Sequence, residues 1–253
     1  VAAVLTEPAG IPAPYLVVIA GTLATVPWLM RASITEQAPP DPDRPPERMA
    51  WSLLRVTPFR AAVALGCATF LMIGAFDALW ALVLDDLHAP DWVANLGIVL
   101  FAVPLVVFGR TGGRLAERFG PFRLGWLGAL IGAVCIASYG LLPSAATLFV
   151  AAMLHSINDG FTVTAASVAI GLSVPAERQA SAHGLFGGVQ VLVGGVTALA
   201  AGVVYEHSSR AVAYGMCAAA MVACVVASRV FLGQPGSAPL FTETTADTLT
   251  ADG

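Results

Sequence analysis

Seven long apolar runs fill most of the sequence and restrict the folds open to this chain. A helix needs about 20 predominantly apolar residues to cross the hydrocarbon layer of a membrane. The runs are unbroken and rich in Ala, Leu, Val and Gly, whereas a barrel strand would be about 10 residues long with strict alternation. The sequence therefore predicts an all-α integral membrane protein. The predicted transmembrane helices are residues 11–30, 61–84, 92–109, 124–142, 145–174, 183–205 and 211–232.

The composition supports lipid as the surrounding solvent. Of the 253 residues, 57% are hydrophobic and 11% are charged, against roughly 25% charged residues in soluble domains. The four cysteines lie inside apolar runs without a CxxC pair, so we expect them to pack as small hydrophobes. The sequence carries no P-loop, no metal-ligand cluster and no catalytic triad. We therefore expect neither an enzyme nor a bound metal or cofactor.

The arginines predict the orientation of the chain. All twelve basic residues are Arg. Eleven of them lie in one set of loops or at the span ends beside them, and only Arg210 lies in the other set. The positive-inside rule makes the first set cytoplasmic. The first residues are then outside, the acidic turn from Asp85 to Asp91 faces outward, and the C-terminal tail is cytoplasmic.

A charged motif occupies the predicted cytoplasmic loop after the third span, at residues 109–123, with the sequence GRTGGRLAERFGPFR. The loop resembles the Gly-x-Leu-Ala-Asp-Arg-x-Gly-Arg-Arg motif of the major facilitator superfamily, which joins the second and third helices and is often echoed in the C-terminal bundle. The matching residues are Gly113, Leu115, Ala116, Arg118 and Gly120. Glu117 stands where Asp is usual, and Pro121 stands where a basic residue is usual, with Arg123 two positions later.

The resemblance implies a twelve-helix transporter of which this chain holds the sixth to twelfth helices. Residues 1–30 would carry the last helix of the N-terminal bundle, and residues 61–232 the C-terminal six-helix bundle. Residues 31–60 are a charged, Pro-rich cytoplasmic linker that ends in a short amphipathic helix, and residues 233–253 are expected to be a disordered cytoplasmic tail. The chain begins with Val and enters a span almost at once, so we expect the rest of the N-terminal bundle to precede it.

The family resemblance further implies secondary active transport of a small organic molecule across the plasma membrane by alternating access. Proton-coupled efflux, as in an antiporter, is the favoured form because the predicted spans carry two carboxylates and a His, and uptake of a polar metabolite is the alternative form. The implied partners are the substrate, protons, the lipid bilayer and the missing N-terminal bundle, with no role for nucleic acid. Two alternatives stay open: a seven-helix receptor or sensor, and an inactive remnant of a truncated transporter.

The residues of the motif also have a physical interpretation. The small residues Gly112, Gly113 and Ala116 permit a close approach of two helix ends. Arg114, Glu117 and Arg118 can bridge to neighbouring helix ends, where the helix dipole favours an opposite charge. We predict that this cluster latches the cytoplasmic side shut during transport. The alternative is that its arginines only fix the topology.

Polar residues at membrane depth mark the candidate site. Ionisable groups inside spans are costly and functional by default. His155 and Asp159 are four positions apart and therefore share one helix face, where they could share a coupling proton. Asn158 beside them and Gln190 are candidate substrate contacts, and Asp77 is a second carboxylate on another helix. For His155, Asp159 and Asp77 a purely structural role is the alternative.

The span at residues 183–205 contains six glycines. Small residues at this density predict close helix packing. A flexing, gating helix is the alternative.

Overall fold

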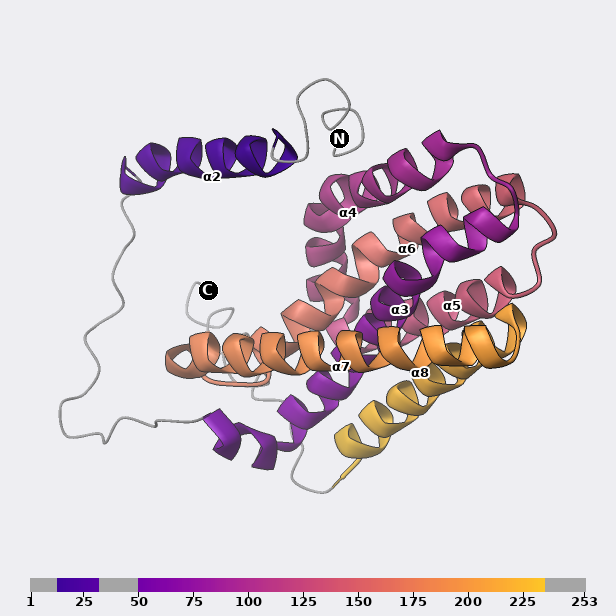
Figure 1. Ribbon diagram of the computed structural model, residues 1–253. Coiled ribbons are helices and arrows are strands. Elements are labelled where there is room, and N and C mark those ends of the chain that lie inside the picture. Colours follow the sequence, from indigo (N-terminus) through magenta and orange to yellow (C-terminus); the bar gives the residue numbers. More distant parts are fainter. Residues whose placement is uncertain (1–12, 32–49, 235–253) are drawn as a thin grey trace. The chain divides into compact units, whose positions relative to one another are not determined.

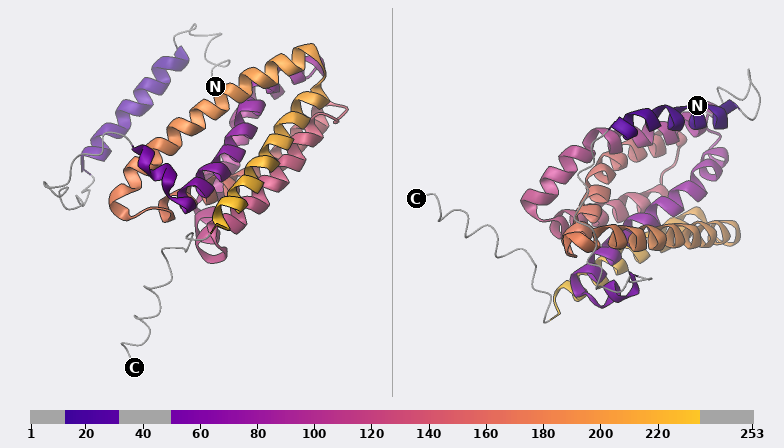
Figure 2. Two further views of the ribbon diagram at one scale, coloured as in Figure 1. Left: turned by 90° about the horizontal axis from the view of Figure 1, so that it is seen from below. Right: turned by 90° about the vertical axis from the view of Figure 1, so that its left-hand side faces the viewer.

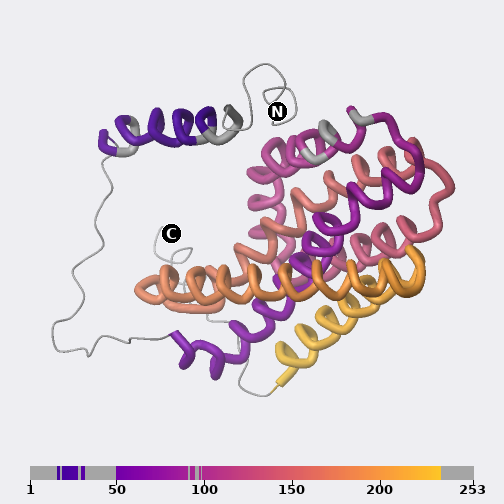
Figure 3. Tube along the Cα trace, in the orientation of Figure 1, coloured from indigo at the N-terminus to yellow at the C-terminus, as the bar shows by residue number. Residues whose placement is uncertain are grey.

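The computed structural model describes residues 13–31 and 50–234, which form seven α-helices and two short 3-10 helices joined by turns (Figure 1). The chain start, most of the predicted linker and the predicted tail lie outside the described residues and are grey in Figure 3. The α-helices are α2 (Ala13–Arg31), α3 (Thr57–Asp86), α4 (Asp91–Phe119), α5 (Pro121–Tyr139), α6 (Ala145–Leu172), α7 (Gln179–His207) and α8 (Arg210–Leu232), and the 3-10 helices are η1 (Ala50–Arg55) and η2 (Ala176–Arg178).

Each predicted span corresponds to one α-helix, and the described residues contain no strand. Five of these helices, α3, α4, α5, α7 and α8, are long and apolar enough to cross a membrane. α6 has 28 residues and is therefore about 42 Å long, which also suffices. Its apolar character is interrupted at the centre by His155, Asn158 and Asp159. The fold is that of an all-α integral membrane protein.

The chain divides into two units, residues 1–48 and 49–253. In the first unit the described element is α2, an apolar helix of 19 residues with Pro27 near its end. In the second unit η1, η2 and α3–α8 pack together into a six-helix unit, in which consecutive α-helices alternate in direction (Figure 2). We call one end of this six-helix unit the arginine-rich end, because it carries Arg60, Arg110, Arg114, Arg118, Arg123, Arg178 and Arg229.

α4 differs from its prediction. The sequence predicted a short span at residues 92–109 followed by a loop, but the helix runs from Asp91 to Phe119 and carries most of the charged motif. The polar motif residues are compatible with a helix that continues beyond the apolar layer. Gly120 ends α4 with φ of +88°, a conformation that a residue with a Cβ adopts only at a cost. Pro121 then starts α5, where its fixed φ suits the first turn.

α3 packs against all five other long helices of the unit, most extensively against α8 and α7. Leu65, Leu79 and Trp80 on α3 are at most 1% exposed. The closest approach to α7 is at Gly74, where a Cβ would lie 2.3 Å from the carbonyl oxygen of Gly194. This close packing confirms the glycine prediction for Gly194. The prediction does not hold for the other five glycines of that predicted span. A Cβ built on any of them would meet no atom of another helix within 4 Å in the described part: Gly184, Gly187, Gly188, Gly195 and Gly202.

Side-chain hydrogen bonds connect neighbouring helix ends and turns at the end opposite the arginine-rich end. Arg210 donates to the carbonyl oxygens of Gly140 and Leu142, the latter at 2.6 Å. The Tyr205 hydroxyl donates to the carboxylate of Asp86 and so links the ends of α7 and α3. The one arginine that departs from the charge bias therefore caps the carbonyl groups that follow α5.

The predicted amphipathic helix at the end of the linker is present as η1. Leu53 is 1% exposed and packs into the core, whereas Trp51 is 57% exposed. η1 contacts α3 and α7. Arg178, in the turn between α6 and α7, donates to the Ser52 hydroxyl at 2.8 Å. η1 is thereby fastened to the arginine-rich end of the unit.

Candidate functional site

α6 carries two ionisable residues into the interior of the six-helix unit. His155 and Asp159 are each 1% exposed, and one helical turn separates them, as the sequence predicted. The Nε2 atom of His155 lies 3.4 Å from Oδ1 of Asp159. The two atoms are in contact, but their alignment is not that of a hydrogen bond, and both carboxylate oxygens lack a hydrogen-bond partner in the described residues. The pair is therefore enclosed, and its hydrogen-bonding groups are not all paired.

Tyr139, at the end of α5, joins this pair, and sequence reasoning missed it. Its hydroxyl lies 2.8 Å from Nδ1 of His155 in a buried hydrogen bond. Tyr214 packs edge-on against the Tyr139 ring at 5.7 Å, and Phe101 packs edge-on against His155 at 6.4 Å. A Tyr near the end of an apolar run ordinarily indicates an interfacial anchor. No local pattern connects Tyr139 to a residue of the next helix.

A glycine provides the space for the imidazole. A Cβ on Gly132 of α5 would lie 3.1 Å from His155 Nε2, closer than most side chains tolerate. The same position faces Met221 of α8 and Met72 of α3, at 3.4 and 3.7 Å. The pair on α6 therefore lies among α3, α4, α5 and α8, and apart from Tyr139 the neighbours named here are apolar or sulfur-containing side chains.

Asn158 is engaged in helix packing. Its Nδ2 donates to the carbonyl oxygen of Gly128 on α5 at 3.0 Å. Thr162, one turn later, donates to the carbonyl oxygen of Asn158. The amide that the sequence suggested for a substrate thus holds α5 and α6 together.

Asp77 and Gln190 do not join the pair. Asp77 is exposed on α3, and Gln190 is half-buried on α7. Within the described residues neither side chain has a hydrogen bond or an ion pair. Asp77 follows Met72 by five residues, which turns it about 140° away from the side of α3 that faces His155. The five predicted residues within the spans therefore separate into the enclosed pair, the packing amide Asn158, and two polar groups that do not join the pair.

The charged motif lies at the arginine-rich end of α4. A Cβ on Gly112 would lie 2.8 Å from the carbonyl oxygen of Gly160, so α4 and α6 approach closely there. Arg114, Glu117 and Arg118 are exposed, and the guanidinium of Arg118 lies over its neighbour's ring, that of Phe119, at 5.4 Å. No ion pair of Glu117 occurs among the described residues. The predicted bridges to neighbouring helix ends are therefore not formed within α3–α8.

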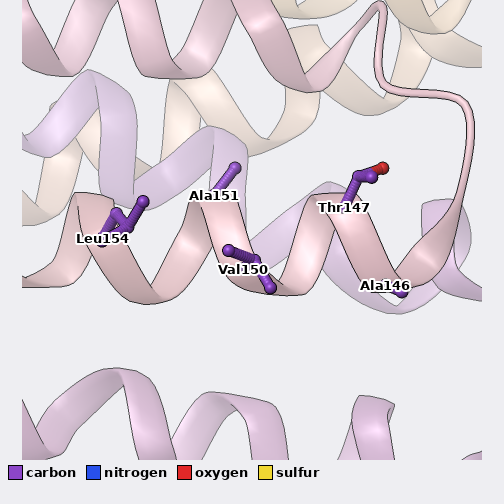
Figure 4. Close-up of a pocket in the computed structure, with 5 residues that line it drawn as sticks. All are labelled: Ala146, Thr147, Val150, Ala151 and Leu154. Carbon is purple, nitrogen blue, oxygen red and sulfur yellow. The ribbon is translucent and has the colours of Figure 1, made fainter.

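The surface hollow on α6 does not reach the pair. Figure 4 shows its lining, which consists of Ala146, Thr147, Val150, Ala151 and Leu154. The one hydroxyl there, on Thr147, donates to the carbonyl oxygen of Ser144 at the start of α6. The described part of the chain also holds no group of three or more His, Cys, Asp or Glu side chains placed to bind a metal. The buried pair and Tyr139 remain the chemically distinctive feature.

Comparison with known families agrees with the motif on α4. The sequence model of the Major Facilitator Superfamily matches residues 65–250, which include all of the candidate site residues and the motif. No curated protein matches the chain.

Proposed function

Because this chain belongs to the major facilitator superfamily, a family of membrane transporters, we propose that it moves a small organic molecule across the plasma membrane with a proton as the coupling ion. In this proposal the molecule leaves the cell as the proton enters, by alternating access. The observation that carries the proposal is the enclosed contact of His155 with Asp159. An ionisable pair at membrane depth is costly to maintain, and the chain keeps it without completing its hydrogen bonds.

The geometry supports a proton relay through the imidazole ring. When Asp159 is ionised, Nε2 of His155 carries the ring proton toward the carboxylate and Nδ1 accepts from the Tyr139 hydroxyl. When Asp159 is protonated, it can donate to Nε2, and Nδ1–H then donates to the Tyr139 oxygen. The two states differ by one proton on the carboxylate and by the direction of both bonds. The His–Asp pair titrates as a unit for this reason.

Enclosure of the pair favours a proton site over a substrate site. A substrate would have to separate α5 from α6 to touch Asp159, whereas a proton needs only a short rearrangement or a water molecule. We propose that the substrate instead contacts the surfaces that carry Asp77 and Gln190, neither of which joins the pair. The bond of Asn158 to Gly128 supports a packing role for that amide.

We further propose that α3–α8 form the C-terminal bundle of a two-bundle transporter. α2 would be the last helix of the N-terminal bundle, and residues 31–60 would link the two. The separation of the chain into two units near residue 48 supports this division, and so does the position of the charged motif between the second and third helices of the unit.

A proton-flux assay tests the proposed function. Everted membrane vesicles that contain the protein with both bundles are energised, and acridine orange reports the pH gradient. Addition of a transported compound should release protons from the vesicle lumen and restore the dye fluorescence. A panel of small organic cations and neutral drugs is the probe set. If no compound dissipates the gradient while a radiolabelled compound still equilibrates across the membrane, proton coupling is excluded.

The orientation can be predicted from the arginines. His88 and Thr111 are both exposed and lie at opposite ends of the six-helix unit. In a variant lacking the four native cysteines, His88→Cys should react with a membrane-impermeant maleimide added to intact cells, because the positive-inside rule places that turn outside. Thr111→Cys should react only after the cells are opened. Labelling of Thr111→Cys in intact cells would show that the orientation is reversed.

The charged motif predicts a transport defect without a folding defect. Arg118→Ala should lower turnover about tenfold, the effect of a rate-limiting barrier that is higher by roughly 1.4 kcal/mol. Membrane insertion should remain normal, because Arg118 is exposed and makes no ion pair within α3–α8. Arg110→Ala is the control, since Arg110 is exposed on the same helix but lies outside the matching motif positions. Loss of insertion in Arg118→Ala would identify the residue as a topology signal instead.

A further inference from the structure

α5 and α8 enclose an apolar groove on the surface of the six-helix unit. Its wall contains no polar side chain and is formed mainly by Leu130, Val134 and Ala137 of α5 and by Ala218, Ala219 and Val222 of α8. Small alanines on both helices keep the groove open. Leu130, Val134 and Val222 are between 36% and 70% exposed. Within the described residues nothing covers these side chains.

A cationic and aromatic cluster lies on the same two helices, between the groove and the arginine-rich end. The guanidinium of Arg229 lies 4.8 Å from the centre of the Trp126 ring. Trp126 donates to the Ser228 hydroxyl at 2.9 Å, and Ser228 donates to the carbonyl oxygen of Ala61 at 2.7 Å. The indole is thereby fixed to α8 and α3. Arg123 lies one turn before Trp126 on α5 and is exposed.

The cluster carries positive charge without an internal counter-ion. Neither α5 nor α8 contains an Asp or a Glu, and no ion pair of Arg123 or Arg229 occurs in the described part. The α5 N-terminus, which begins at Pro121, adds the partial positive charge of the helix dipole. An anion at this position would therefore meet two guanidinium groups and a helix N-terminus.

The dimensions match one membrane leaflet. Arg229 and Ala218 are eleven residues apart on α8, as are Trp126 and Ala137 on α5, so the far end of the groove lies about 16 Å from the cluster. The groove lining itself begins at Leu130 on α5 and at Val222 on α8. Half of a hydrocarbon layer of about 30 Å is about 15 Å. A Trp at one end of the groove and Arg beside it are the side chains expected at headgroup level.

We propose that this α5/α8 groove binds one anionic phospholipid. Arg123 and Arg229 hold the phosphate of the headgroup, Trp126 lies at the level of the glycerol backbone, and one acyl chain follows the groove as far as Ala218. The lipid belongs to the leaflet at the arginine-rich end. This binding site is separate from the His155–Asp159 pair, which lies inside the unit, and it does not depend on the coupling ion.

Native mass spectrometry of the purified full chain in a neutral detergent tests the proposal. The probes are dioleoyl phosphatidylglycerol, which is anionic, and dioleoyl phosphatidylcholine, which has no net charge. We expect one phosphatidylglycerol to be retained in preference to phosphatidylcholine. Arg123→Gln and Arg229→Gln should each weaken its binding about fivefold, the contribution of one basic residue near an anionic lipid surface. Arg114→Gln, an exposed arginine at the end of α4, is the matched control and should change nothing.

A second variant tests the acyl-chain part of the groove. Ala219→Phe fills the groove and leaves both arginines in place, so it should reduce phosphatidylglycerol binding, whereas Val203→Phe on exposed α7 should not. Equal binding of the two lipids, or unchanged binding in both arginine variants, overturns the proposal. Displacement of the lipid by inorganic phosphate alone, or unchanged binding in Ala219→Phe, would show that only an anion is recognised. A dimer that Ala219→Phe disrupts would assign the groove to a second copy of the chain.

Discussion

Asp159→Asn is expected to abolish substrate accumulation driven by a pH gradient, reducing it by at least about tenfold to the level of passive entry. The amide keeps the shape of the carboxylate and can still contact His155, but it cannot take up and release a proton. Exchange and downhill flux should continue, because they need the substrate site and the motion of the bundles but no proton carrier. The measurement compares uphill uptake with counterflow in proteoliposomes that hold the protein with both bundles.

Asp77→Asn is the matched comparison, because it makes the same chemical change on α3. Asp77 is exposed and has no contact with the His155–Asp159 pair, so its loss should reduce gradient-driven accumulation less completely. A normal expression level for both variants is required for the comparison. If uphill transport is unchanged in both, the carboxylates are structural and the coupling group lies in the N-terminal bundle.

Gly74→Ala is expected to destabilise the six-helix unit by about 1–3 kcal/mol, the usual cost of overpacking a filled interior. Its new Cβ would lie 2.3 Å from the carbonyl oxygen of Gly194 and 2.9 Å from the Gly194 Cα. Both are backbone atoms, so no side chain can rotate away, and α3 must separate from α7. The measurement is the free energy of unfolding of the purified chain as a function of denaturing detergent.

Gly215→Ala provides the control for this prediction. Gly215 lies in α8, and a Cβ there meets no atom within 4 Å. Because Ala is the better helix former, this variant should be as stable as the parent or slightly more stable. Equal stability of Gly74→Ala and Gly215→Ala would mean that α3 and α7 are not packed as closely as described.

The pair on α6 illustrates what local sequence can predict. The spacing of His155 and Asp159 places them on one face of any helix, whatever surrounds it. Their enclosure and their contact at 3.4 Å follow from how α5, α4 and α3 pack around α6. Tyr139 could not be predicted as a partner, because its bond to His155 depends on the register between two helices. That register is determined by side-chain packing such as the fit of the imidazole over Gly132.

The motif on α4 illustrates what hydropathy alone cannot predict. Its residue types indicated a functional segment, and the family match agrees with that interpretation, but the apolar run alone ended the helix too early. Hydropathy reports where a helix leaves lipid and does not report where its backbone hydrogen bonds stop. Gly120, with its positive φ, marks the actual end, and its position between Phe119 and Pro121 is a local signal that turn chemistry could have identified.

The sequence by itself determined the membrane class, the seven helices and the family, because these depend on the hydrophobicity of each segment and on local spacing. Only the tertiary structure decided which surfaces the polar residues occupy. It separated Asp77 and Gln190 from the pair, bonded Asn158 to α5, and brought Arg229 over Trp126 beside an apolar groove. The physical reason is that hydrophobic burial in a membrane places each segment in the bilayer, whereas the relative rotation and register of helices are determined by close contacts between residues far apart in the chain.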